Sequence, residues 1–390
     1  MANNSARLLH FPEEIVTKIL LGVPVKDLLR LKTVCKPWFS IISNPSFIKS
    51  HLHRAIISPT LLTILNPPPL QHELAFASII PHLLSIFETP APPAQLRRQQ
   101  FVSKALDDVI GQDLSKCEVH LDRVVMPRFL YPCRVVASCD GIVCLSDFNS
   151  DSVYLWNPAI RQFKKLPDSS LSVTHWFPRN FGFGYDSISG DYKVVMSYTD
   201  LPFVEVYSNN ANSWTEIWYR ADIHWERYTG TNVVVNGVLY FDTSNELVSF
   251  DMRTEVFGLV PFPSGVQGKG SDVLDFEGSV AMVFQSDSGI DLWTLDDVSG
   301  SDEVSWTKKF STQLNDDEEG DIWLKLYLGG GQFYGEKSLD DGDVFLYNVL
   351  YDYEKREAKC YGLGEECKVL AALKYNWTFV SLDGFEKTPN

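Results

Sequence analysis

Several features that would indicate a particular class of protein are missing from this sequence. The seven cysteines are an odd number and contain no Cys-x-x-Cys pair, so the sequence predicts neither a disulfide framework nor structural zinc. Met1 to His10 holds one arginine and no long apolar run, which argues against a secretory signal. The longest apolar stretch, Leu74 to Phe87, is interrupted by Pro81 and His82 and is too short to span a bilayer. We therefore expect a soluble protein of the cytoplasm or nucleus that binds no membrane.

Positive charge is also scarce. The chain has 34 Lys and Arg against 50 Asp and Glu, a net charge of −16, and a pI near 4.9. Because nucleic acids and anionic membranes bind basic surfaces, this composition argues against both as partners. Residues 1–56 hold eight basic and three acidic side chains, a charge of +5, which leaves −21 for the remainder. We expect a charged partner of that remainder to be basic.

Residues with the spacing of a catalytic or metal site are few. After Val119 there are three histidines, His120, His175 and His224, and none has metal-ligand spacing to a cysteine or another histidine. The sequence has no nucleophile elbow and no phosphate-binding loop, and Gly329-Gly330-Gly331 is interpreted as a turn. The acidic run over 316–321 lacks the alternation of a calcium loop. We predict no metal, no cofactor and no enzyme activity; a hydrolase or oxidase is the less favoured alternative.

The N-terminal residues show a helical pattern. Pro12 suits a first helical position, Glu13 and Glu14 place negative charge in the first turn, and Gly22 with Pro24 ends the run. Further short helices are predicted from about Lys26 onward. A module of roughly 45 residues is close to the size below which a domain seldom buries enough apolar surface alone. We expect the rest of the chain or another protein to cover it.

An ordered set of residues runs through these helices: Phe11-Pro12-Glu13-Glu14-Ile15, Ile19-Leu20, Val23-Pro24-Val25-Lys26, Leu28-Leu29-Arg30, Val34-Cys35-Lys36 and Trp38. This order resembles an F-box in the form common in plants, with Phe11 where the family usually has leucine and Pro37 where a small or basic residue is usual. The resemblance implies docking on the Skp-type adaptor of a cullin-RING ubiquitin ligase. By that resemblance, the adaptor-binding face consists of Phe11, Pro12, Ile15, Ile19, Leu20, Val23, Pro24, Leu28, Leu31, Val34, Cys35 and Trp38. The alternative interpretation is an ordinary helical cap.

From about Val119 onward, short runs of β-branched and aromatic residues separated by turn residues predict strands. An aromatic residue, a polar turn and a second aromatic residue recur, and the leading aromatics are Trp156, Tyr207, Phe250, Trp293 and Tyr351. Their intervals of 51, 43, 43 and 58 residues fit four-stranded propeller blades. Tight Gly turns at Asp140-Gly141, Asn236-Gly237 and Glu277-Gly278 share the period, and each is expected to lead into an inner strand. The second aromatics are Phe163, Trp214, Phe257, Trp306 and Tyr361.

The repeat predicts a closed propeller. Packing sheets radially covers both apolar faces of each sheet and leaves only short edges. Five units are visible and about six are expected, the sixth either shared between 124–136 and 369–382 or placed within 322–339. Several segments of this region also resemble the plant F-box-associated domain, a kelch-like propeller: Trp156-Asn157-Pro158-Ala159-Ile160-Arg161, Phe181-Gly182-Phe183-Gly184-Tyr185-Asp186, Asp191-Tyr192-Lys193-Val194-Val195, Val204-Glu205-Val206-Tyr207 with Asn212-Ser213-Trp214, and Ser249-Phe250-Asp251.

The chain is therefore expected to be an α+β multidomain protein. We predict a small all-α F-box module over 1–54, a Pro-containing connector over 55–118, and an all-β propeller of about six blades over 119–390. The connector contains Pro67-Pro68-Pro69 yet is rich in apolar residues, so we expect it to pack on a neighbour or form a short helix. A disordered linker is the alternative.

The two resemblances together imply a substrate-recognition subunit of a ubiquitin ligase. The module would bind a Skp-type adaptor, and through it a cullin, while the propeller holds a target protein that is expected to be basic. Interface-type residues in two predicted loops are the candidates for target binding: His175, Trp176, Arg179, Trp225, Arg227 and Tyr228. Trp176 and Trp225 could instead pack between blades. A scaffold that promotes no turnover is an alternative function.

Overall fold

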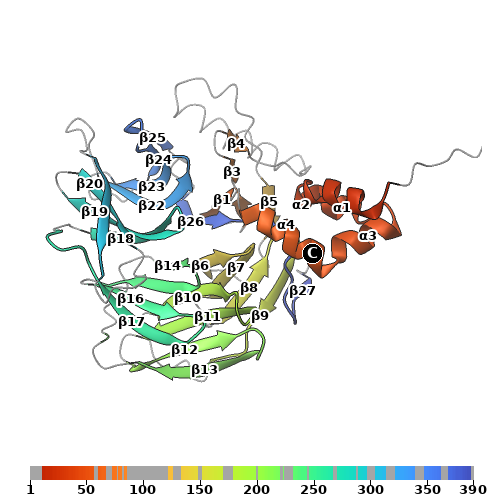
Figure 1. Ribbon diagram of the computed structural model, residues 1–390, viewed down its shortest axis with the longest axis horizontal. Helices are drawn as coiled ribbons and strands as arrows, with labels where there is room; N and C mark the ends of the chain where they lie inside the picture. The colour runs from red at the N-terminus through yellow and green to blue at the C-terminus, as the bar shows by residue number, and fades with distance from the viewer. Residues whose placement is uncertain are drawn as a thin grey trace, which may run out of the picture.

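A helical module and a larger set of strands make up the chain. The computed structural model describes residues 11–56, 60–66, 73–76, 78–80, 83–85, 122–125, 133–147, 152–169, 179–198, 201–219, 223, 232–243, 246–266, 270–286, 289–296, 304–312, 321–338, 347–361 and 368–387. Figure 1 shows the helices gathered at one side of the strands. Within these residues, no helix has the length and apolarity that crossing a membrane requires.

Four helices form the N-terminal module: α1 (Glu13–Leu21), α2 (Val25–Leu31), α3 (Lys36–Ser43) and α4 (Pro45–Ile56). Helix α1 starts directly after Pro12 with two glutamates in its first turn, and the Gly22 N–H donates to the Ile19 carbonyl at its end. Helix α2 follows Pro24, and Pro37 lies in the first turn of α3. The prediction of an N-terminal all-α module is confirmed.

Five antiparallel sheets of four strands follow, and we number them blades 1 to 5. Blade 1 holds β6 (Cys133–Cys139), β7 (Ile142–Asp147), β8 (Val153–Asn157) and β9 (Gln162–Lys165), with β27 (Glu386–Lys387) added outside β9. Blade 2 holds β10 (Arg179–Asp186), β11 (Asp191–Tyr198), β12 (Phe203–Ser208) and β13 (Ser213–Trp218). Blade 3 holds β14 (Asn232–Val235), β15 (Val238–Asp242), β16 (Glu246–Asp251) and β17 (Val256–Pro261).

Blade 4 holds β18 (Gly270–Phe276), β19 (Ser279–Ser286), β20 (Gly289–Leu295) and β21 (Trp306–Thr312). Blade 5 holds β22 (Asp321–Gly329), β23 (Gln332–Ser338), β24 (Tyr347–Asp352) and β25 (Glu357–Tyr361). The first strands of the blades are neighbours in the order β6, β10, β14, β18 and β22, and β26 (Lys368–Tyr375) lies between β22 and β6. The strands therefore close into a ring, and the propeller fold is confirmed.

The sixth position of the ring is occupied by a smaller sheet. There β26 pairs in antiparallel register with β1 (Thr60–Asn66), from Thr60 opposite Tyr375 to Asn66 opposite Lys368 (Figure 1). Two further strand pairs are β2 (Glu73–Phe76) with β5 (Asp122–Val125), and β3 (Ser78–Ile80) with β4 (Leu83–Ser85). The C-terminal strand thus belongs to the sixth position, whereas 322–339 lies mostly in β22 and β23 of blade 5.

The partner of that C-terminal strand differs from the sequence-based expectation. Residues 60–66 fall in the stretch interpreted as a connector, whereas one of the two placements expected for the sixth unit had 124–136 share it with 369–382. The edge of β26 carries backbone N–H and C=O groups that need partners, and the largely apolar run beginning at Thr60 supplies them. Residues 60–66 are therefore part of the ring.

The Gly turns and the aromatic repeat both shape the blades. Asp140 and Gly141 have φ of 51° and 79°, and Asn236-Gly237 and Glu277-Gly278 are equivalent, which is the geometry of two-residue hairpin turns. Each of these turns joins the first and second strands, so the strand after the turn is second from the centre and the innermost strand precedes it.

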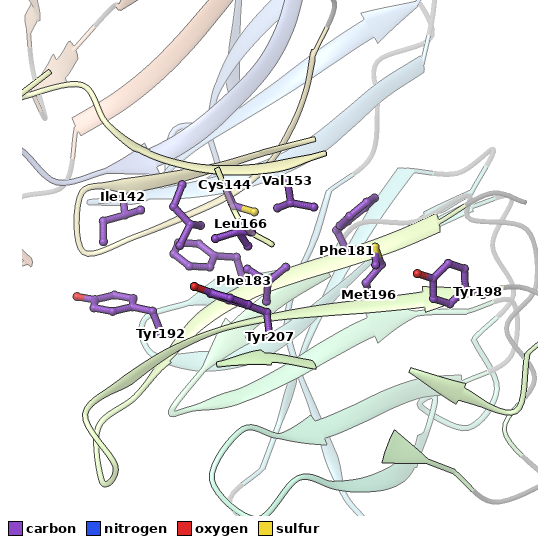
Figure 2. Packing of buried hydrophobic residues seen from close by; sticks show 12 residues of the cluster. Ile142, Cys144, Val153, Leu166, Phe181, Phe183, Tyr192, Met196, Tyr198 and Tyr207 are labelled. Atoms are coloured by element: carbon purple, nitrogen blue, oxygen red, sulfur yellow. The ribbon is translucent and has the colours of Figure 1, made fainter. Parts of the chain in front are cut away.

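The leading aromatics all lie on third strands and pack toward the preceding sheet. Trp156, Tyr207 and Phe250 face Phe163, Trp214 and Phe257 on the fourth strand, as direct cross-strand pairs. In blades 4 and 5 the directly opposite residues are Lys308 and Ala358 instead. Figure 2 shows the packing of a leading aromatic residue on the preceding sheet: Tyr207 and Phe183 of blade 2 lie against Ile142 and Cys144 of blade 1. The apolar core of the ring thus consists of layers between neighbouring blades.

Candidate protein-docking surfaces

The helical module exposes several large apolar side chains. Phe11, Ile15, Ile19, Val34 and Phe39 are 62, 45, 59, 61 and 56% exposed, and we call these five residues the apolar face. They are five of the eight large exposed hydrophobic residues in the described part of the chain, within a span of 29 residues. Clustered apolar exposure of this kind marks surfaces that bind other proteins.

The apolar face exists because helix α1 is apolar on two sides and only one of them is buried. Leu20 packs inward with Leu28 of α2 and Ile42 of α3, each at most 2% exposed. Ile15 and Ile19, one helical turn apart, point to the other side. The sequence therefore encodes a second apolar stripe that the fold of the module does not use.

The predicted adaptor-binding residues divide by burial. Seven are exposed: Phe11, Pro12, Ile15, Ile19, Pro24, Val34 and Cys35. Three are partly buried: Val23, Leu31 and Trp38. Leu20 and Leu28 are fully buried in the core of the module, so they support the apolar face from beneath and do not line it.

Phe39 belongs to the apolar face but was not identified from the sequence. The signal was present in the helical period, because Trp38 and Ile42 are four residues apart and face inward, which turns Phe39 outward. Exposed basic side chains accompany the face on each of the first three helices: Lys18, Arg30 and Lys36. Exposed acidic side chains lie on the same helices, Glu13 and Glu14 on α1 and Asp27 on α2, and Asp27 pairs with Arg30 at 3.6 Å, so the surface that a partner would meet is apolar with charges of both signs.

The module also packs on blade 1 and on the C-terminal segment. Its core cluster includes Ala159 and Ile160, in the turn between β8 and β9, together with Trp377 and Phe379. The Phe379 ring lies 6.0 Å from the His51 ring in an edge-on arrangement, and the Lys32 Nζ lies 4.7 Å from the centre of the Phe379 ring. The ring thus covers part of the module, and among the described residues the five of the apolar face take no part in that packing.

The module and the predicted target-binding segments are attached near opposite ends of the ring. The Tyr192 hydroxyl, at the turn end of blade 2, donates to Asp140 in the turn of blade 1 at 3.0 Å, so equivalent blade ends lie together. The module contacts this turn end of blade 1. Strands β10 and β14 begin at the other end, which we call the far end.

The structure describes little of the predicted target-binding residues. His175, Trp176, Trp225, Arg227 and Tyr228 lie outside the described residues. Arg179 is the first residue of β10 and so lies at the far end of blade 2, although its side chain is not described.

An exposed tryptophan also lies at the far end of blade 2. Trp218, the last residue of β13, is paired with Phe203 and is 66% exposed. Its ring centre lies 5.2 Å from that of Phe203. Trp218 was not among the residues predicted to bind a target.

A cavity of about 470 Å³ lies at the centre of the ring. It is lined by residues of the first strands of the five blades and of β26. Its lysines are paired: the Lys325 Nζ is 2.9 Å from an Asp272 carboxylate oxygen, and the Lys374 Nζ is 3.0 Å from one of Asp275. Lys374 lies on β26 and Asp275 on β18, so this second pair joins two strands that are separated in the ring by β22. Both lysines of the cavity therefore have a carboxylate partner within the ring.

Burial shifts the pKa values of two further titratable groups of the cavity. Burial raises the pKa of the Cys139 thiol, which keeps it protonated and a weak nucleophile. Burial also raises the pKa of the Glu336 carboxyl, a shift that Lys325 opposes and Asp272 increases. None of the described lining residues is a histidine. Elsewhere in the described ranges, no three His, Cys, Asp or Glu side chains are grouped so as to hold a metal ion.

Comparison with known proteins gives a consistent result for both parts of the chain. Residues 8–50 match the family model of the F-box domain, and residues 104–348, well over half of the chain, match that of the F-box associated beta propeller domain. The F-box protein CPR1 of Arabidopsis thaliana is 27% identical over 340 residues, covering 77% of this chain and 73% of that protein. The F-box/kelch-repeat protein At3g23880 of the same organism is 25% identical over 330 residues, covering 81% and 83%.

Proposed function

The chain belongs to the family of proteins that join an F-box domain to an F-box associated β-propeller, and from this we propose that it is a substrate-recognition subunit of a cullin-RING ubiquitin ligase. The helical module docks on a Skp-type adaptor, and through it on a cullin, in the cytoplasm or nucleus. The propeller holds a target protein. The chain itself contributes proximity, which raises the effective concentration of the target near the ubiquitin-charged enzyme.

The observation that carries this proposal is the apolar face. Five large apolar side chains are exposed on a module that also packs on the ring, and no residue in the described part of the chain is packed over them. An aqueous surface of this kind is stabilised when a partner covers it, at about 25 cal/mol per Å² of apolar area removed from water. The family assigns that partner the role of adaptor.

Two features support a protein target at the far end of the ring. Trp218 presents an aromatic surface of the type that dominates protein interfaces, and the residues after 56 carry a net charge of −21. We propose a basic target on the second ground, because opposite charge speeds association and opposes binding of acidic proteins.

A catalytic role receives less support. The cavity at the centre of the ring holds paired lysines and a buried thiol whose raised pKa makes it a weak nucleophile, and its described lining includes no histidine. The raised pKa of the Glu336 carboxyl is a feature there that would suit general acid-base chemistry, but no strong nucleophile accompanies it in the described lining. We propose that the chain acts without chemistry of its own. A scaffold that binds the adaptor but promotes no degradation is the second candidate, since the same apolar face would serve it.

The proposal is tested by placing a charge on the apolar face. Ile19→Asp introduces a carboxylate at a 59% exposed site, and Ile188→Asp is the matched control because Ile188 is 73% exposed in the turn between β10 and β11 of blade 2, outside the module. We expect Ile19→Asp to weaken binding of a purified Skp-type adaptor at least tenfold by calorimetry, with Ile188→Asp within twofold of the unmodified chain. Changing Leu28 would be uninformative, since it is fully buried and alanine there would loosen the module.

Equal adaptor affinity for the two variants would contradict the proposed function. If the adaptor binds as expected, the half-life of a captured target with and without the chain separates the ligase subunit from the scaffold. A shortened half-life supports the ligase, and an unchanged half-life supports the scaffold.

A further inference from the structure

The C-terminal segment, Tyr375 to Lys387, lies between the helical module and blade 1 and is held to the blade along its length. The Asn157 Nδ2 donates to the carbonyls of Thr378 at 3.2 Å and Val380 at 2.8 Å, and the Thr378 hydroxyl donates to the Asp140 carbonyl at 2.7 Å. Further along, β27 pairs with β9. Asn157, which is fully buried, thus binds the segment to the ring through two backbone carbonyls.

One residue of this segment reaches into the module. Phe379 is 4% exposed and shares a core with Leu20, Val25 and Leu28. His51 of α4 and Lys32, just beyond α2, both contact its ring. The His51 Nε2 also lies 3.1 Å from the Val23 carbonyl, which ties the end of α4 to the link between α1 and α2. The backbone around Phe379 is thus bound to the propeller, while the Phe379 side chain is inserted among three helical elements of the module.

The module has two attachments to the ring, and they differ in kind. One is covalent: α4 ends at Ile56 and β1 begins at Thr60, so three residues join the module to the sixth position. The other is the packing of the module on Ala159 and Ile160 of blade 1 and on Trp377 and Phe379 of the C-terminal segment, of which Phe379 is the more deeply buried aromatic residue. A body held by a single short link can rotate about it, whereas a second contact at a separate place fixes its orientation.

We propose that Phe379 is a positioning residue that fixes the angle between the adaptor-docking module and the propeller. This rests on the proposed function, and it adds that the C-terminal segment decides where a protein on the far end of the ring stands relative to the ubiquitin-charged enzyme. Ubiquitin reaches only lysines that come close to that enzyme, so a fixed angle selects which lysines are modified. Loss of the Phe379 contact leaves each surface able to bind but removes the selection.

The angle is measured directly by pulsed electron spin resonance on the full chain. Spin labels carried on genetically encoded amino acids at Lys49 in α4 and Arg253 in blade 3, both exposed, report the distance between module and ring. We expect one narrow distance distribution in the unmodified chain and at least a twofold broader one in Phe379→Ala. Phe379→Leu, which keeps an apolar side chain in the module, should restore the narrow distribution.

Phe385→Ala is the matched control, because Phe385 lies in the same segment but packs on the core between blades 1 and 2. It should keep the narrow distribution, and the adaptor affinity of Phe379→Ala should stay within twofold of the unmodified chain. A narrow distribution in Phe379→Ala, in a chain whose melting curve remains cooperative, would overturn the inference and leave the proposed function standing.

The functional readout uses the lysines of the chain itself as acceptors in a ligase reconstituted with purified adaptor, cullin and conjugating enzyme. In the wild-type chain, mass spectrometry should find ubiquitin concentrated on few lysines. In Phe379→Ala, the share of ubiquitin on the most frequently ubiquitinated lysine should fall at least threefold. An unchanged pattern would overturn the positioning role. If the wild-type chain receives no ubiquitin, the proposed function is overturned, and with it the positioning role. The spin-label result would still stand.

Discussion

At the scale of single residues, the most constrained backbone position is a turn glycine beneath the C-terminal segment. Gly141 has a φ of +79°, and a Cβ built there would lie 2.4 Å from the Asn376 carbonyl oxygen and 2.4 Å from the Thr378 hydroxyl. Gly237 occupies the same position in the turn of blade 3, also with a φ of +79°, but a Cβ built there would have no atom within 4 Å. The two glycines share a conformational requirement and differ only in their surroundings.

Gly141→Ala and Gly237→Ala therefore separate backbone strain from close packing. We expect Gly237→Ala to lower the free energy of unfolding by about 1 kcal/mol, the cost of a left-handed alanine. Gly141→Ala should cost about 3 kcal/mol, because the C-terminal segment must also shift. Thermal or denaturant melts of both variants measure the difference, and equal losses would show that the segment does not press on this turn.

At the scale of elements, each blade depends on an aromatic residue in its third strand. Phe250 is fully buried between blades 2 and 3, where it contacts Phe257 on the adjacent strand at a ring distance of 4.8 Å. Trp218, also on a blade strand, is larger but 66% exposed. Burial, and not aromatic character alone, should decide what each contributes to stability.

Phe250→Ala is expected to lower the free energy of unfolding by about 3–5 kcal/mol, since it removes buried apolar area and leaves a cavity. Trp218→Ala should change it by less than about 1 kcal/mol because most of its surface already faces water. Denaturant titration checks both values. Comparable losses would indicate that Trp218 holds the blade together, which would argue against its proposed role in target binding.

At the scale of the whole molecule, the ring closes through a strand from before the propeller region. β1 supplies the partner of β26 at the sixth position, from Thr60 to Asn66. Without it, β26 would expose a row of unpaired backbone groups between blades 5 and 1. The closure of the ring thus joins residues more than 300 positions apart in the chain.

Two truncations test this closure. A chain beginning at residue 57 lacks the helical module but keeps β1, and it should melt cooperatively, somewhat below the full chain because Phe379 loses its cover. A chain beginning at residue 67 lacks β1 as well and should melt lower by a further 10 °C or so, about the effect of several kcal/mol, and aggregate. Matching melting curves for the two chains would mean that β1 is dispensable.

Local signals in the sequence were sufficient for the elements and for the overall class of fold. Pro12 with Glu13 and Glu14 sets the start of α1, and the Gly turns set the hairpins of the blades, because both depend on residues a few positions apart. The spacing of the leading aromatics was sufficient to predict the propeller, since each blade repeats the same local pattern. The family resemblance identified the module on the same residues.

Only the tertiary structure decided which surfaces are free and how the parts are joined. The pairing of β1 with β26 and the insertion of Phe379 among the helices each depend on residues far apart in sequence. Local sequence patterns therefore do not predict them. Burial behaves in the same way: Leu28 and Ile19 are both apolar helix residues, yet one is sealed in the core and the other is exposed. The sequence by itself determined the helices, the strands and their repeat, because these depend on short-range sterics and periodicity. Contacts between distant parts of the folded chain decided which residues form the docking face and how that face is oriented relative to the propeller.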